Sequence, residues 1–238
     1  MQLPVSLYTV SLFITLLAIM LICVKLRKLT FPAALLAGVI GICVYLGAAE
    51  NGIVILFTFF SIGVLATSHK KSMKLAIHHQ TPDGPRDAGQ VFANGGTAAI
   101  LGFLAFIDRT HSSIYQTMLA ASLASALADT LSSELGMVYG RQFYNILTLK
   151  RDEKGLDGVV SLEGTLIGVA GAGLIGLLFA GFNPLALVVA VAGILGNLTD
   201  SILGATLERK HYINNNVVNF MNTAFAALVA LLLMGIHP

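Results

Sequence analysis

Long apolar stretches, separated by short polar segments, recur along the whole sequence. A run of about 20 apolar residues is long enough for a helix to cross a hydrocarbon core about 30 Å thick. The pattern therefore predicts an all-α fold, a polytopic helical membrane protein of about eight transmembrane helices that forms a single integral membrane domain over residues 1–238. The predicted spans are residues 7–24, 30–48, 52–67, 91–107, 114–136, 162–182, 185–206 and 216–236.

The composition agrees with a lipid environment. Hydrophobic residues make up 56% of the chain and charged residues only 11%, whereas soluble domains carry about 25% charged residues. A soluble globular protein is therefore excluded. The first apolar stretch lacks the basic start and the small-residue cleavage site of a secretory signal, so we expect it to be retained.

The basic residues predict the orientation of the spans. With the N-terminus outside, all but one of the 14 Lys and Arg residues fall on the inner side, and Arg109 is the exception. Because cytoplasmic loops carry an excess of Lys and Arg, we expect both termini outside the cell inner or plasma membrane. The loops at 68–90, 137–161 and 207–215 then face the cytoplasm. They are the long ones, so chemistry is expected on this side.

Polar residues line one face of the fifth predicted span. Ser122, Ser125, Asp129 and Ser132 follow the three-and-four spacing of a helix face. An ionisable residue inside a span costs about 2.5–3.5 kcal/mol on insertion scales, so Asp129 marks a candidate site. For the serines, a role in holding helices together stays open.

The seventh predicted span has a similar face. Gly193, Asn197, Asp200, Gly204 and Glu208 are separated by four, three, four and four positions. Small residues such as glycine allow membrane helices to approach closely. We therefore expect the polar members of this face to point at a neighbouring helix or at a bound molecule.

The start of the eighth span is rich in asparagine, with Asn215, Asn219 and Asn222 on one face.

There is also a weak internal similarity between segments 127–136 and 198–208, which share an Asp followed by a hydroxyl residue and an aliphatic residue. Spans four–five and six–seven would then form a parallel internal repeat. Such a repeat predicts that the two acidic faces lie at equal depth and converge on one site.

The residue types at these positions favour oxygen ligation of a hard cation. Mg²⁺ is usually bound by one or two carboxylates together with substrate phosphates, and the candidate metal ligands are Asp129, Glu134, Asp200 and Glu208. Arg86 stands in a Gly/Pro-containing segment, and its guanidinium is suited to bidentate binding of phosphate. Zinc-ligand spacing, the Walker A sequence, GxGxxG and a Ser-His-Asp arrangement are all absent from the sequence.

Two glycine-containing segments are expected to be helix starts. Asn94-Gly95-Gly96 and Gly164-Thr165 precede apolar runs, and free backbone N–H groups at a helix N-terminus bind anions. We expect both starts to face inward and to contribute to a phosphate site.

Five segments, in order, resemble the membrane family known as domain of unknown function ninety-two. That family includes the transmembrane-protein-nineteen-like proteins and the plant phytyl-phosphate kinase. The resemblance covers about residues 30–236, although the segment DGVVSLEG departs from the more glycine-rich pattern expected there. The segments are RDAGQVFANGGT (86–97), SALADTLSSELG (125–136), DGVVSLEGT (157–165), GNLTDSILGATLE (196–208) and NNNVVNFMNT (214–223).

The resemblance implies an Mg²⁺-dependent kinase that transfers phosphate from a nucleoside triphosphate, CTP or ATP, to a prenyl monophosphate lipid. It implies catalytic roles for Arg86, Asp87, Asp129 and Asp200, with Asp129, Glu134, Asp200 and Glu208 as metal ligands. The implied substrate- or nucleotide-binding residues are Gln90, Asn94, Gly95, Thr130, Ser133, Ser161, Asn197, Ser201, Asn215, Asn216 and Asn219.

A different class of function stays open on the sequence alone. Parallel repeats and intramembrane carboxylates also describe a small ion or metabolite transporter. The polar residues crowd the predicted inner half of the spans and leave the outer ends bare, which favours the enzyme. We expect membrane lipids and a prenyl phosphate as partners and no nucleic acid, and a homodimer stays open.

Overall fold

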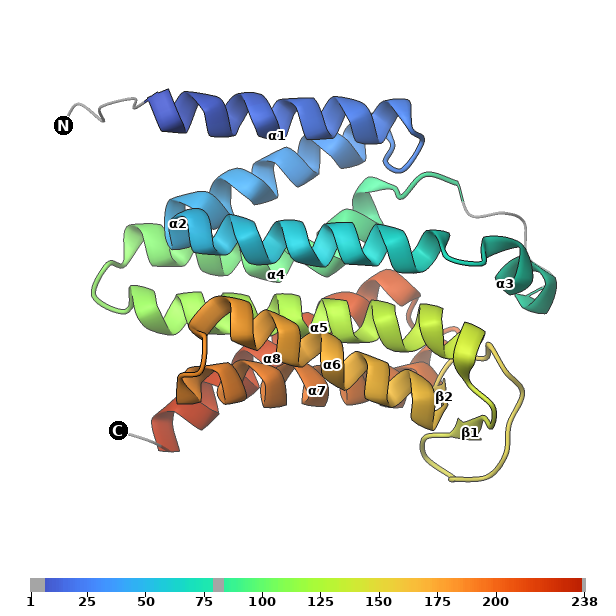
Figure 1. Cartoon of the computed structure of the whole chain (residues 1–238). Coiled ribbons are helices and arrows are strands. Elements are labelled where there is room, and N and C mark those ends of the chain that lie inside the picture. The colour runs from blue at the N-terminus through green and yellow to red at the C-terminus, as the bar shows by residue number, and fades with distance from the viewer. Residues whose placement is uncertain (1–6, 79–83, 237–238) are drawn as a thin grey trace.

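The computed structural model describes residues 7–78 and 84–236. Within these ranges the chain forms a bundle of long helices with one two-stranded hairpin (Figure 1). The predicted loop 68–90 lies partly outside the described residues. The elements are α1 (Leu7–Lys25), α2 (Phe31–Ser68), α3 (Lys71–His78), α4 (Ala88–Ile107), α5 (Ser112–Tyr139), β1 (Tyr144–Asn145), β2 (Val159–Val160), α6 (Leu162–Ala180), α7 (Pro184–Leu203), the π-helix η1 (Gly204–Glu208) and α8 (Asn215–Ile236).

Helix α2 contains two of the predicted spans. Its 38 residues would extend about 57 Å as one straight helix, nearly twice the hydrocarbon thickness. The backbone of Ala49 is non-helical, with φ 48° and ψ −140°, so the helix breaks where the sequence predicted a turn between spans. Figure 1 shows the two halves running in opposite directions. The predicted division at 48–52 is therefore confirmed.

All eight predicted spans are helical. Within the described residues, five helices are long and apolar enough to cross a membrane, namely α2, α4, α6, α7 together with η1, and α8. The eight predicted spans count the two halves of α2 separately, and they also include α1 and α5. Eight crossings stay a prediction, as does the internal repeat. Helix α3 was not predicted, because the segment 68–90 was expected to be a loop.

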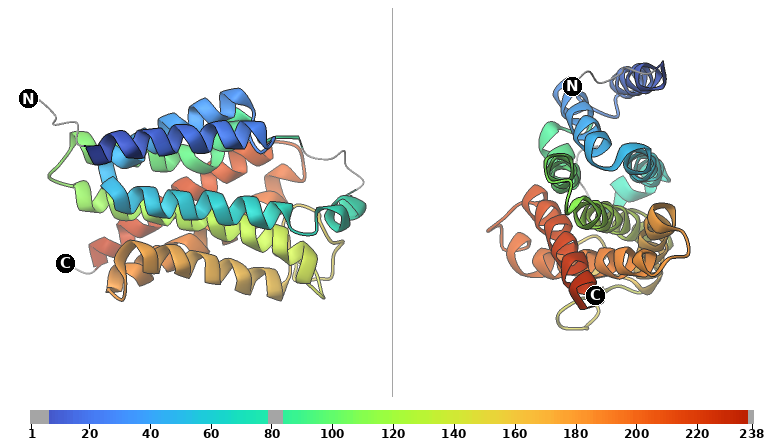
Figure 2. Two further views of the ribbon diagram at one scale, coloured as in Figure 1. Left: turned by 45° about the horizontal axis from the view of Figure 1, so that its top comes forward. Right: turned by 90° about the vertical axis from the view of Figure 1, so that its left-hand side faces the viewer.

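Helix α5 lies in the centre of the bundle (Figure 2) and packs against α2, α4, α6, α7 and α8. Its core positions are mostly small or branched apolar residues, and Leu119, Leu123 and Leu127 are fully buried. Small side chains allow close approach from several sides at once. Different faces of α5 therefore contact most of the other helices.

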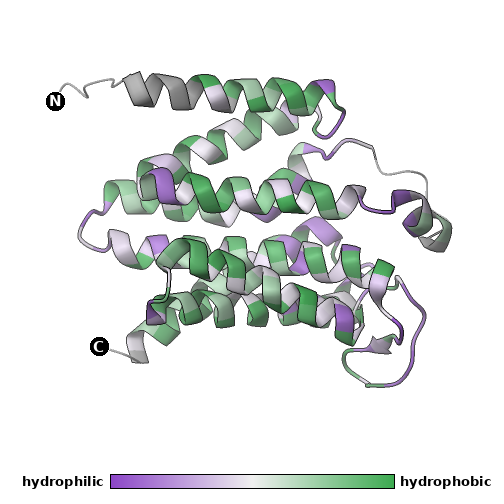
Figure 3. Ribbon diagram, in the orientation of Figure 1, coloured by the Kyte–Doolittle hydropathy of each residue, from purple (hydrophilic) through white to green (hydrophobic). Residues whose placement is uncertain are grey.

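The polar segments gather at one end of the bundle. Figure 3 shows hydrophilic residues concentrated in the loops beside α3 and the hairpin, while the helix surfaces are largely hydrophobic. Helix α1 begins, and α8 ends, at the opposite end (Figure 1). This grouping agrees with the predicted positions of the long loops. The side of the membrane on which they lie stays a prediction.

Candidate functional site

Asp129 and Asp200 face each other at the polar end of the bundle. Asp129 lies on α5 and Asp200 on α7, and both side chains line the same polar cavity, where their charges interact. Two carboxylates this close repel unless a proton or a cation lies between them. The expectation that the two acidic faces converge is therefore met.

Close helix packing brings this pair together. A Cβ atom on Gly193 would approach the Cβ of Ala124 to 2.7 Å, so α7 can lie directly against α5 only because this position has no side chain. Farther along α7, a Cβ atom on Gly196 would lie 2.2 Å from Ser125 Oγ and 2.9 Å from Ala226 Cβ, so a side chain has no space at this position either. The sequence predicted this use of glycine on the seventh span.

Asn222 of α8 fixes the position of Asp200. Its Nδ2 donates to Oδ1 of Asp200 at 2.6 Å, and its Oδ1 accepts from the hydroxyl of Ser125 at 3.1 Å. The side chain of Asn222 is only 1% exposed. Asn222 was recognised in the sequence as part of the asparagine face, but it was not included among the candidate site residues. Its helical spacing from Asn215 and Asn219 was the available signal.

Two polar cavities meet at Asp129. The first, called here the central cavity, has a volume of about 260 Å³ and includes Arg86, Asp129, Glu134, Asn215 and Asn219 in its lining. The second, called the loop cavity, has a volume of about 280 Å³ and is bounded by the 155–161 segment, α7 and η1. Asp129, Ser133 and Asn215 line both cavities.

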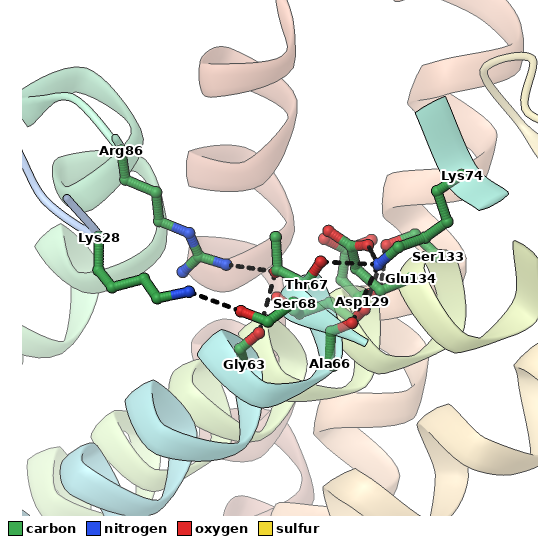
Figure 4. A network of polar contacts seen from close by, with 11 residues as sticks. Lys28, Gly63, Ala66, Thr67, Ser68, Lys74, Arg86, Asp129, Ser133 and Glu134 are labelled. Atoms are coloured by element: carbon green, nitrogen blue, oxygen red, sulfur yellow. Dashed lines mark hydrogen bonds and ion pairs between the residues drawn. The ribbon is translucent and has the colours of Figure 1, made fainter. Parts of the chain in front are cut away.

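Arg86 reaches the central cavity from the segment before α4. Its backbone N–H donates to the carbonyl of Lys28 at 3.0 Å, and its carbonyl accepts from Thr30 N–H at 3.0 Å, so the residue is anchored to the α1–α2 connection. Its guanidinium Nη2 donates to Oγ1 of Thr67 at 3.1 Å (Figure 4). Among the described residues, Arg86 forms no ion pair within 4 Å. Burial lowers the pKa of Arg86, and the charge of Glu134 partly opposes this effect.

Lys74 of α3 is the ion-pair partner of Glu134, which lines the central cavity. Its Nζ forms an ion pair with Glu134 and donates to the carbonyl oxygens of Ala66 at 3.0 Å and Thr67 at 2.9 Å (Figure 4). These are carbonyls of the last turn of α2, where a cation is favourable.

The ion pair with Lys74 changes the interpretation of Glu134. The sequence placed Glu134 among four metal ligands, but its carboxylate already has a cationic partner. In the described part of the chain, no group of three or more His, Cys, Asp or Glu residues lies close enough to hold a metal ion. A four-carboxylate centre is therefore not formed. Glu208 lines the loop cavity with Asp129 and Asp200, on the π-helix η1.

The remaining features fit a cation with phosphates. Mg²⁺ commonly uses one or two protein carboxylates, and Asp129 and Asp200 could supply them. Asn219 Oδ1 is buried and has no hydrogen-bond partner, and Asn219 lines the central cavity. A buried carbonyl oxygen without a partner costs free energy unless a ligand satisfies it. The donor set is therefore compatible with Mg²⁺ and a phosphate substrate.

Asp87 does not reach either cavity. Its side chain accepts from Gln90 N–H at 2.8 Å, while Gln90 Oε1 accepts from Asp87 N–H at 3.0 Å. This reciprocal capping box begins α4. The structure thus gives Asp87 a helix-capping role, and the predicted catalytic role has no geometric support.

Helices α4 and α6 both begin before the glycine-containing segments that were predicted as helix starts. Because α4 begins at Ala88, Asn94-Gly95-Gly96 lies in the helix interior, where backbone N–H groups are already bonded. At α6, Gly164 N–H donates to the Ser161 hydroxyl and Thr165 N–H to the Ser161 carbonyl. The prediction of free N–H groups at both segments is therefore wrong.

The other predicted binding residues divide among the cavities. Asn216 is an exception, because it lines neither polar cavity and its amide lies against Gly89. Gly95 lies instead against Ile40, at a third, apolar cavity. The central cavity includes Gln90, Asn94, Thr130, Ser133, Asn215 and Asn219, and the loop cavity includes Ser133, Ser161, Asn197, Ser201 and Asn215.

A hairpin and its ion pair support the loop cavity. Arg209 Nη1 lies 2.8 Å from Asp152 Oδ2, joining the 144–160 segment to the end of η1. The hydrogen bond from Arg209 lowers the pKa of Asp152 to about 2. Asp157 and Gly158 of this segment line the cavity beside Asp200 and Glu208. The sequence contained no signal for the Asp152–Arg209 pair.

The long apolar helices and the acidic site at one end define a polytopic helical membrane protein. Comparison with known proteins agrees, since the model of the integral membrane protein family DUF92 matches residues 14–227. The chain belongs to this family. The family recognised in the sequence is therefore confirmed.

Individual relatives extend over most of the chain. An uncharacterized membrane protein of Methanocaldococcus jannaschii is 32% identical over 94% of both chains. The chloroplastic protein VTE6 of Arabidopsis thaliana is 31% identical over 83% of this chain and 62% of its own length. An uncharacterized membrane protein of Synechocystis is 32% identical over 82% of this chain and 78% of its own length. No solved structure matches the chain significantly.

Proposed function

We propose that this protein is a prenyl-phosphate kinase that transfers a phosphoryl group from a nucleoside triphosphate to a prenyl monophosphate. The observation that carries the proposal is Asp129 at the meeting point of two polar cavities, with Asp200 beside it in the loop cavity. One cavity contains Arg86, which forms no ion pair with a carboxylate of the described residues. Two adjoining polar cavities suit two phosphate-bearing substrates. The similarity to VTE6 and the resemblance to the family of the plant phytyl-phosphate kinase support it.

The reaction needs positioning and charge neutralisation more than proton transfer. An oxygen of the lipid monophosphate attacks the γ-phosphorus, the bond from that phosphorus to the β–γ bridging oxygen breaks, and a nucleoside diphosphate leaves. The second pKa of a phosphate monoester is about 6, so the attacking oxygen is already ionised at pH 7. A strong general base is therefore unnecessary, in agreement with phosphoryl transfer in other kinases.

Named residues then have separate tasks. Arg86 binds and orients the acceptor phosphate from the central cavity, and the loop cavity receives the nucleotide phosphates. Asp129 and Asp200 would hold Mg²⁺, which neutralises phosphate charge when bound. Asn222 is a positioning residue that keeps the Asp200 carboxylate oriented toward Asp129.

The packing of α5 disfavours the transporter alternative. A carrier needs a polar path on both sides of its binding site. On the side of Asp129 away from the polar end, Leu119, Leu123 and Leu127 are fully buried in the apolar core. The polar cavities therefore lie at one end of the bundle, as an interfacial enzyme requires.

The test is a phosphoryl-transfer assay with purified protein in detergent. The protein is incubated with Mg²⁺, with ATP, CTP, GTP or UTP, and with farnesyl, geranylgeranyl or phytyl monophosphate, and products are identified by mass spectrometry. We expect prenyl diphosphate from at least one combination, and none from Asp200→Asn or without nucleotide. Absence of diphosphate in every combination, together with saturable binding of an inorganic ion, would contradict the kinase and favour the carrier.

A further inference from the structure

A third cavity lies beside the central cavity and is almost entirely apolar. It has a volume of about 330 Å³ and is lined by α1, both halves of α2 and the start of α4. We call it the chain cavity. Arg86, Gln90 and Asn94 line both this cavity and the central cavity. Among the described lining residues, Arg86 is the only charged one.

We propose that the chain cavity binds the hydrocarbon chain of a single-chain lipid monophosphate, with the phosphate held at Arg86, and that its walls set the accepted chain length. This inference rests on the proposed function for the role of the lipid as phosphate acceptor. An apolar chain attached to a dianionic head matches an apolar cavity that ends at one partly buried cation.

The cavity has the depth that such a chain requires. Ile53, at its far end on α2, lies fourteen residues from Thr67, which binds the Arg86 guanidinium. At 1.5 Å per residue this separation is about 21 Å along the helix. With the head at the polar end, a bound chain would therefore extend past the middle of a hydrocarbon core about 30 Å thick.

The cavity also has an opening toward lipid. Val54 and Phe57 line it, and their side chains are 46% and 51% exposed on the surface of the bundle. In a membrane protein such apolar surface faces lipid. A chain can therefore enter sideways from the bilayer while its head stays at the polar end. A soluble substrate would enter from water, so an entrance from the bilayer favours a lipid substrate.

The walls are apolar side chains that can define a length. Ile40 is buried at the wall formed by the first half of α2. A Cβ on Gly38 would approach Met20 Sδ to 2.9 Å, so α1 lies close to α2 on this side. Methionine adapts its shape to its neighbours. The cavity can thus fit flexible chains up to a limit that its walls impose.

Ala37 offers a way to shorten the cavity. It lines the cavity seven residues beyond Thr30, whose backbone binds the Arg86 carbonyl, or about 10 Å along the helix. Ala37→Phe should block the cavity beyond this depth. We expect the ratio of kcat/KM for geranylgeranyl over geranyl monophosphate to fall at least tenfold. The matched control is Ala170→Phe on the exposed face of α6, which should leave the ratio unchanged.

A binding experiment tests the site without relying on turnover. A geranylgeranyl monophosphate analogue with a diazirine at the chain end is irradiated with the full-length protein in vesicles, without nucleotide. Labelled peptides are then mapped by mass spectrometry. We expect labels within residues 15–23 and 53–60, reduced by unlabelled geranylgeranyl monophosphate and by Arg86→Gln. Labels spread over the outer surfaces of α6 and α8 would overturn the proposal.

The two experiments separate this inference from the proposed function. Diphosphate formation with an unchanged chain-length ratio in Ala37→Phe, and no label in the chain cavity, would overturn the chain site and leave the kinase standing. Competed label in the chain cavity without diphosphate formation would support the lipid phosphate site and contradict the kinase. If Ala37→Phe does not fold, Ala37→Leu replaces it, with Ala170→Leu as its control and the same expected direction.

Discussion

Asn222 donates a hydrogen bond of 2.6 Å to Asp200, so α8 holds the carboxylate that α7 presents to Asp129 on α5. Three helices thus meet at one pair of acidic side chains. The same amide accepts a bond from Ser125 on α5. A buried amide that uses both its donor and its acceptor fixes the relative positions of the groups around it.

Removing this amide should affect both stability and turnover. Asn222→Ala leaves the Ser125 hydroxyl and the Asp200 carboxylate without their partner, and an unsatisfied buried polar group costs about 1–3 kcal/mol. We expect a lower Tm in detergent and a loss in kcat larger than any change in KM for either substrate. The control is Asn51→Ala, whose exposed amide donates to the Phe179 carbonyl. Equal effects of the two variants would contradict a positioning role for Asn222.

The aspartate pair should be required for turnover and dispensable for folding. Asp129→Asn and Asp200→Asn each remove one of two facing charges, so repulsion in the ligand-free protein falls. We expect kcat to drop at least about a hundredfold, the size seen when a transition-state charge loses its partner. The Tm without Mg²⁺ should stay equal or rise.

Asp108→Asn is the matched control for the aspartate pair. Asp108 lies at the other end of the bundle and bonds His111 and Tyr115 on the surface. Its replacement should leave kcat within about twofold. Full activity in Asp129→Asn would contradict the assigned site.

Substitutions of Lys74 and Glu134 should have strongly coupled effects on the stability of the protein. Removing one member of a fully buried ion pair costs about 3–5 kcal/mol, because the other charge is left uncompensated, and the cost is smaller here because the Glu134 side chain is 21% exposed. Lys74→Met and Glu134→Gln should therefore each lower Tm, and the double variant should be less destabilised than the sum of the two. The coupling is measured as a double-mutant cycle of thermal or denaturant unfolding. Strict additivity would show that the pair does not fix α3 to α5.

Gly158 is expected to tolerate no side chain. Its φ is +72°, and a Cβ would overlap the backbone of Ala205 in η1. Gly158→Ala should push the 155–161 segment away from η1, which would open the loop cavity. We expect a lower Tm and a raised KM for the nucleotide with little change in KM for the lipid. Gly173→Ala, at a helical position with open space around it, should not lower Tm.

The Asp152–Arg209 ion pair predicts that the stability of the 144–160 segment decreases at acidic pH. The pKa of Asp152 is about 2 in the folded protein, below its ordinary value of 3.8. A carboxyl with a depressed pKa contributes stability above its unfolded pKa and loses it as pH falls through the folded pKa. The protection factors of residues 144–160, which compare each exchange rate with the intrinsic rate at the same pH, should therefore fall between about pH 4 and pH 2. In Asp152→Asn this step should be absent, and exchange should already be faster at pH 7.

The sequence determined most of the helices of this protein. Crossing a hydrocarbon core requires long apolar runs with internally bonded backbones, so hydropathy located the helices and the break near Ala49. The capping box of Asp87 and Gln90 is local as well, although its reciprocal bonding was recognised only in the structure. Asp129 and Asp200 were identified because charged residues inside apolar spans are costly and therefore conspicuous.

The tertiary structure decided which polar groups meet. Glu134 was expected to bind metal, but a lysine sixty positions away in the sequence neutralises it. The sequence does not distinguish Asn222 from the neighbouring asparagines, and only the packing of α8 places it against Asp200. Likewise, backbone hydrogen bonds to the α1–α2 connection determine the position of Arg86. Hydrophobic periodicity reports whether a residue faces lipid or protein. It does not report which partner a side chain meets, because that depends on how the helices pack around α5.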